Sequence, residues 1–143
     1  PASHLPKIYN TPRPLIPNKN KPELMLSPIN IGGPPDLINL EVGGQKFCLV
    51  HGYPGDDHDT RIWGRVDTDS KSPFPDTICI VGHTPTVFLT NRHDEDLSIW
   101  YGEGILDIDC GCGNRDVVHR RLACLRLEDM AEFYVGGATA KYD

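Results

Sequence analysis

The sequence has 143 residues, of which 38% are hydrophobic and 24% are charged, which is typical of one globular domain with a modest core. It contains 20 Asp and Glu against 14 Lys and Arg, so its net charge of −6 excludes bulk electrostatic binding to nucleic acid or to anionic lipid. No run approaches the ~18 unbroken apolar residues of a membrane span, so we expect no membrane partner.

Proline is concentrated in the N-terminal region, where nine of the 13 prolines fall within residues 1–35. Proline fixes φ and lacks a backbone donor, so this stretch is predicted to be an extended or disordered arm or linker rather than a regular helix or central strand. Residues 1–22 carry four Lys and Arg and no acid, so a basic arm that contacts an acidic partner is the alternative. The folded domain is expected to cover 36–143.

Beyond residue 36 the chain is predicted to be mostly β. Residues 37–42 alternate between apolar and polar, and Gly43-Gly44 supplies a two-residue turn into 45–51, which is typical of a hairpin. Further strands are expected at 77–81, 86–90, 97–101, 105–109, 121–127 and 131–135. Short helices are predicted within 57–66 and at 115–120.

The sequence has five cysteines, an odd number, and it shows no secretory signal pattern of a charged stretch followed by an apolar one. Cys48, Cys79 and Cys124 have apolar neighbours, which favours reduced, buried thiols and a cytoplasmic protein. Cys110 and Cys112 form a close pair, but no second pair accompanies them, so a structural zinc site is disfavoured.

Two apolar strands end in a histidine beside a glycine, His51-Gly52 and Gly82-His83. The strand fixes the backbone, glycine lets a ligand approach, and neutral imidazole is a good donor to zinc, iron or manganese. The two histidines are therefore candidate metal ligands. The alternative is that each is a partly buried, hydrogen-bonded side chain.

Five segments together resemble the calcineurin-like metallophosphoesterases, and most closely the bacterial and phage-type serine/threonine phosphoprotein phosphatases. They are Phe47-Cys-Leu-Val-His-Gly-Tyr-Pro54, Arg61-Ile-Trp-Gly-Arg65, Ile80-Val-Gly-His-Thr-Pro85, Ile108-Asp-Cys-Gly-Cys112 and Arg121-Leu-Ala-Cys-Leu-Arg-Leu-Glu-Asp129. The resemblance covers about 37–129, which corresponds to the C-terminal half of the family's catalytic domain. It implies an α/β fold, a β-sandwich flanked by helices, of which this mostly β chain supplies the C-terminal sheet.

The resemblance also implies a site. His51 and His83 match the two family histidines that bind one ion of a dinuclear centre of manganese, iron or zinc type, and Arg65 matches a catalytic arginine that contacts the substrate phosphate. Two metals clamp a phosphoryl group, and a guanidinium suits phosphate geometry. The implied activity is hydrolysis of a phosphoric monoester, with a phosphorylated protein or a small phosphoester as substrate.

Three family motifs have no match before His51: Asp-x-His, Gly-Asp-x-x-Asp-Arg-Gly and Gly-Asn-His-Glu. The stretch Gly55-Asp-Asp-His58 has the letters of the first, but it follows Tyr53-Pro54 rather than a strand, so a loop is predicted. The complete two-metal site is therefore not encoded here, and we expect the isolated chain to be inactive, as a truncated or degenerate part of a phosphatase.

Two further interpretations stay open. The chain could be a non-catalytic, pseudophosphatase-like binding module, or it could be completed by another chain. A sheet without its partner layer exposes an apolar face, so self-association or strand exchange is expected if these 143 residues are the whole protein.

Overall fold

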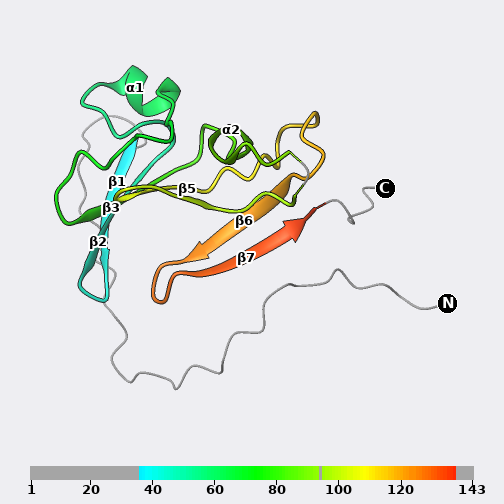
Figure 1. The fold of residues 1–143 in the computed structure, drawn as a ribbon. Coiled ribbons are helices and arrows are strands. Elements are labelled where there is room, and N and C mark those ends of the chain that lie inside the picture. The colour runs from blue at the N-terminus through cyan, green and yellow to red at the C-terminus, as the bar shows by residue number, and fades with distance from the viewer. Residues whose placement is uncertain (1–35, 94, 138–143) are drawn as a thin grey trace.

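The computed structural model describes residues 36–93 and 95–137, and it is mostly β, as the sequence predicted (Figure 1). The proline-rich region 1–35 lies outside the described residues. One sheet has five strands in the order β1 (Leu37–Val42), β2 (Gln45–Val50), β3 (Thr77–Val81), β5 (Ile105–Asp107) and β4 (Trp100–Tyr101). A separate two-stranded sheet is formed by β6 (Arg121–Arg126) and β7 (Ala131–Gly136), and the helices are α1 (His58–Trp63) and α2 (Val87–Thr90).

The predicted hairpin is present as β1 and β2, which pair antiparallel with Val42 opposite Gln45. The turn between them needs glycine, because φ is +60° at Gly43 and +85° at Gly44. A two-residue hairpin turn whose twist matches that of its strands requires positive φ at both central positions.

The centre of the large sheet is parallel, since β3 pairs parallel with both β2 and β5. A parallel pair needs a crossover connection. Residues 51–76 make that connection between β2 and β3, and they contain α1, which falls inside the predicted helical stretch 57–66. The carboxyl ends of parallel strands lie at one edge of the sheet, so the segments that begin at His51 and at Gly82 start side by side.

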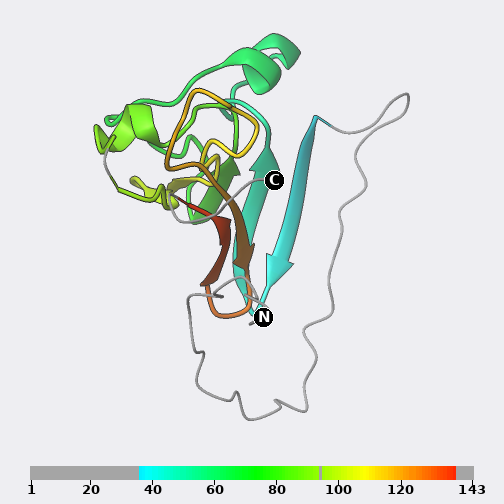
Figure 2. The same cartoon turned by 90° about the vertical axis from the view of Figure 1, so that its right-hand side faces the viewer.

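Each face of the large sheet has its own apolar cluster. One contains Leu40, Phe47 and Leu106 and receives the inner side of the β6–β7 hairpin, from which Ala123 and Tyr134 project. This hairpin is a separate layer beside the five-stranded sheet (Figures 1 and 2). The other face buries a second set, namely Cys48, Val50, Val66, Cys79, Val81, Leu89 and Ile105. Burial of each such aliphatic side chain contributes about 1.5–3 kcal/mol.

The outer side of the β6–β7 hairpin carries apolar side chains that no described residue covers. Leu122 and Val135 are cross-strand partners and are 57% and 64% exposed. Cys124 lies on the same side, which makes the prediction that it is buried wrong: β6 alternates, and Cys124 falls on the outward face with Leu122. The exposed pair is consistent with self-association, which stays a prediction.

Three predicted elements differ from the structure. Residues 86–90 were expected as a strand but contain α2, which ends at Asn91 in the left-handed conformation with φ +53°. Val87 and Leu89 are buried while Phe88 is exposed, and a short apolar run with this pattern does not distinguish a strand from one helical turn. Of 97–101, Trp100 and Tyr101 alone pair with β5. Residues 115–120 form turns rather than a helix.

The remaining strands are found close to where they were expected. Cys48, Cys79 and Cys110 are buried and all five cysteines are free thiols. Among residues 36–93 and 95–137, no helix has the length and apolar character needed to cross a membrane.

Candidate functional site

The two predicted histidines meet at the carboxyl edge of the parallel strands. The Nε2 atom of His51 and the Nδ1 atom of His83 are 3.0 Å apart, and the two rings meet edge to face with 4.8 Å between centroids. The segments that carry them are joined by a backbone hydrogen bond of 3.0 Å from the Gly82 amide to the His51 carbonyl. Residues 32 positions apart in sequence therefore present two imidazole nitrogens to one point.

The pair is partly open to solvent. His51 is exposed and His83 is half-buried, with the exposed Trp63 ring 6.0 Å from the His83 ring. Burial lowers the pKa of His83 below its usual value, and electrostatic interactions with His51 and Arg65 lower it further, while Asp109 opposes them. The neutral imidazole that these effects favour is the form that binds metal.

Arg65 is brought to the same edge by the segment that follows α1. The Val66 amide donates a 3.3 Å hydrogen bond to the Oγ1 atom of Thr84, the residue next to His83. The Arg65 side chain is exposed, and its charge acts on His83. The structure thus places all three predicted site residues in one neighbourhood.

Gly52 explains how α1 comes so close to His51. Its amide donates a 2.6 Å hydrogen bond to the carbonyl of Arg61. A Cβ atom added at Gly52 would lie 2.8 Å from the carbonyl oxygen of Gly64 and 2.9 Å from that of Thr60. The absence of a side chain at this position therefore lets the last turn of α1 pack directly against the residue after His51.

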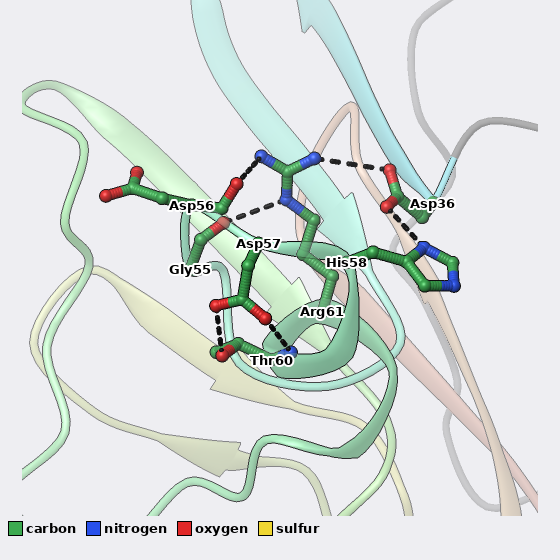
Figure 3. A network of polar contacts seen from close by, with 7 residues as sticks. All are labelled: Asp36, Gly55, Asp56, Asp57, His58, Thr60 and Arg61. Carbon is green, nitrogen blue, oxygen red and sulfur yellow. Dashed lines mark hydrogen bonds and ion pairs between the residues drawn. The ribbon is translucent and has the colours of Figure 1, made fainter.

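Residues 55–57 form a loop that leads into α1, as the sequence predicted, whereas His58 is the first residue of the helix (Figure 3). Asp57 caps the helix by accepting hydrogen bonds from the Thr60 amide at 2.8 Å and the Thr60 hydroxyl at 2.6 Å.

Arg61 holds this loop in place (Figure 3). Its guanidinium donates to the carbonyls of Gly55 at 2.8 Å and Asp56 at 3.1 Å, and to the carboxylate of Asp36 at 3.3 Å. Asp36 also pairs with His58 Nδ1 at 2.9 Å. The hydrogen bond from His58 and the charge of Arg61 lower the pKa of Asp36. These polar contacts therefore hold the crossover together.

A buried carboxyl at the end of β5 is a feature that the sequence analysis missed. Asp107 is fully buried and accepts a 2.9 Å hydrogen bond from the Asp109 amide through Oδ1, while its Oδ2 has no partner among the described residues. Burial raises the pKa of Asp107 to about 7. The run Leu106-Asp-Ile-Asp109 alternates apolar and acidic residues like a strand with one polar face, so nothing in it indicated that Asp107 is buried.

The candidate metal ligands at this edge are the two imidazole nitrogens of His51 and His83. Within the described ranges, no three His, Cys, Asp or Glu side chains are grouped closely enough to hold a metal ion. The two histidines would supply two ligands, whereas a catalytic zinc site has three from the protein.

No family model, curated protein or solved structure matches this chain. The resemblance to metallophosphoesterases therefore depends on the motif residues alone, and membership of that family stays a prediction.

Proposed function

We propose that this chain carries the C-terminal part of a metal-dependent phosphatase site, in which His51 and His83 bind one divalent ion and Arg65 contacts the phosphate of a phosphoric monoester. The substrate would be a phosphorylated protein or a small phosphoester. The observation that carries the proposal is the 3.0 Å separation of the two imidazole nitrogens at the ends of adjacent parallel strands.

The separation of these nitrogens fits two ligands of one ion. Two nitrogens that are each about 2.0–2.1 Å from the same metal lie roughly 3 Å apart. The same distance also fits a hydrogen bond between two neutral imidazoles, which is the bland interpretation. The exposed position of His51 favours a ligand-binding role, because the pair opens to solvent instead of filling the core.

The chain's own groups fit phosphate recognition. A divalent ion at such a site supplies Lewis acidity toward a phosphoryl group. Arg65 adds a planar guanidinium whose donors match two phosphate oxygens. The hydrogen bond from the Val66 amide to the Thr84 hydroxyl links the backbone next to Arg65 with the backbone next to His83.

A second candidate is a binding module without catalysis. Two imidazoles and one guanidinium are enough to contact a phosphate, whereas in the part of the chain that the structure describes no third ligand joins the pair. This candidate predicts phosphopeptide binding without turnover. The phosphatase proposal predicts hydrolysis once the missing ligands are supplied.

The experiment is a titration of inorganic phosphate into the protein, with and without Mn²⁺, followed by calorimetry. We expect binding that depends on Mn²⁺ and that weakens at least about tenfold in Arg65→Ala, because a charge-assisted hydrogen bond contributes roughly 1.5–3 kcal/mol. Arg92→Ala is the control, since Arg92 is exposed and pairs with Glu95.

Hydrolysis of para-nitrophenyl phosphate in the same samples separates the two candidates. If the affinity for phosphate is the same with and without Mn²⁺ and is unchanged in Arg65→Ala, both the phosphatase and the binding-module candidates are contradicted. If the protein binds phosphate but does not hydrolyse the substrate even when another chain supplies the missing metal ligands, the binding module is favoured.

A further inference from the structure

Cys48 and Cys79 form a buried thiol pair at the centre of the large sheet. They are directly opposite each other in the β2–β3 register, and both are 0% exposed. Both belong to the same apolar cluster, so their side chains point to the same face. Neighbouring strands lie about 4.8 Å apart, within the 4.4–6.8 Å between Cα atoms that a disulfide spans.

A pocket lies at the end of the sheet opposite the histidines, and residues next to the thiol pair, but neither cysteine itself, line it. Its volume is about 520 Å³, and its lining includes Lys46, Ser72, Thr77 and Gly104. The Oγ atom of Ser72 is 3.3 Å from the Sγ atom of Cys79. Ser72 therefore lines the pocket and also contacts the sulfur of Cys79, which is itself fully buried.

The polar contacts of the two thiols make them unequal. Hydrogen bonding from the Cys48 thiol and, less strongly, from Ser72 lowers the pKa of Cys79, against the opposing effect of burial. The same contact with Cys79, together with burial, raises the pKa of Cys48. The hydroxyl of Ser72 lies 3.0 Å from the carbonyls of Phe74 and Thr77, and on ionisation of Cys79 it would rotate from them to donate to the thiolate. Since the thiolate is the nucleophile, Cys79 is the sulfur that reacts first.

We propose that Cys48 and Cys79 form a peroxide-reactive dithiol, in which hydrogen peroxide entering through the pocket oxidises Cys79 and Cys48 then closes a disulfide. The function proposed for the histidine pair is not needed for this chemistry, which takes place on other residues.

The chemistry balances with hydrogen peroxide as the oxidant. The Cys79 thiolate attacks one peroxide oxygen, the O–O bond breaks, and the departing hydroxide takes a proton to become water. Cys79 is then a sulfenic acid. The sulfur of Cys48 attacks the sulfur of Cys79, the S–S bond forms, and the S–O bond breaks, so the hydroxyl leaves with the Cys48 proton as a second water. Two thiols are oxidised and one peroxide is reduced.

The test is peptide mapping of the folded protein by mass spectrometry. The chain is exposed to hydrogen peroxide, its remaining thiols are alkylated in denaturant, and the peptides are compared with those of an untreated sample. The exposed Cys112 and Cys124 are first replaced by Ser, so that they cannot compete. We expect a cross-linked peptide pair that joins residues 48 and 79, has lost two hydrogens, and disappears on treatment with a dithiol reductant.

Two variants in the same background assign the roles. Cys48→Ser should leave a sulfenic acid at residue 79 that dimedone traps, and Ser72→Ala should slow disulfide formation several-fold. Oxidation of the exposed Cys112 in the unsubstituted chain shows that the peroxide treatment was effective. If Cys48 and Cys79 are both still fully alkylated under that treatment, the proposal is overturned. A disulfide that joins Cys110 to either of them would also overturn it. Both of these results can be read without Cys48→Ser or Ser72→Ala, so poor folding of either variant does not obscure them.

Discussion

Replacing Asp107 with Asn removes a titrating group from the buried end of β5. The folded pKa of Asp107 is raised from 3.8 to about 7, mainly by burial. Between these values the folded state keeps a proton that the unfolded state releases. The contribution of Asp107 to stability is therefore fully present below about pH 4 and is lost as the pH rises through 7.

The size of the effect follows from the pKa difference. One pKa unit corresponds to about 1.36 kcal/mol, so ionisation of Asp107 in the folded protein costs up to about 4 kcal/mol over the whole range. Between pH 5 and pH 8 the expected loss is about 2–3 kcal/mol. Asn has the same shape as the protonated acid and does not titrate, so Asp107→Asn should escape this loss.

The assay is urea unfolding of the native sequence and of Asp107→Asn at pH 5 and pH 8. We expect the free energy of unfolding of Asp107→Asn, relative to the native sequence, to rise by about 2–3 kcal/mol between the two pH values. Asp116→Asn is the control, because this carboxylate is exposed and its replacement should leave the pH dependence unchanged. A difference that is the same at both pH values would refute the claim that Asp107 is protonated in the fold.

Two further substitutions test the crossover that carries Arg65. Gly52→Ala should lower the free energy of unfolding by about 1–3 kcal/mol in urea, because its Cβ would overlap backbone carbonyls of α1. Gly113→Ala has open space and should change stability by less than about 0.5 kcal/mol, so equal effects at the two glycines would contradict the packing described. Arg61→Ala should cost about 1–3 kcal/mol by thermal unfolding, since it removes the side-chain donor to two carbonyls and one of the two partners of the Asp36 carboxylate. Arg92→Ala, which breaks an exposed ion pair, should have little effect. If Arg61→Ala unfolds at the same temperature as Arg92→Ala, the contacts of Arg61 do not stabilise the loop.

The sequence was a good guide wherever local chemistry determines structure. Gly43-Gly44 could be assigned to a hairpin turn because only a few residue types adopt positive φ twice in succession. His51 and His83 could be singled out because two apolar strands end in the same way, and the resemblance implied that they bind one ion. The structure adds that the two strands are parallel neighbours, so both ends lie at one edge with 3.0 Å between the imidazole nitrogens.

Where tertiary contacts decide, the sequence was silent or misleading. Residues 86–90 have the apolar run of a strand, yet the Thr86 amide bonds to the Asp109 carbonyl and the following residues turn into α2. Asp107 looks like an ordinary polar position in an alternating strand, and its burial depends on what covers β5 from elsewhere in the chain. The opposition of Cys48 and Cys79 likewise depends on the register of β2 and β3, which neither strand specifies alone.

The most direct test of the central claim is a calorimetric titration of Mn²⁺ and, separately, Zn²⁺ into the native chain, His51→Ala, His83→Ala and the control His93→Ala, whose side chain is exposed. The account predicts one ion per chain, with affinity unchanged in His93→Ala and at least about tenfold weaker in each of the other two variants. Binding of either ion that is equal in all four proteins would contradict the assignment of the histidine pair as metal ligands.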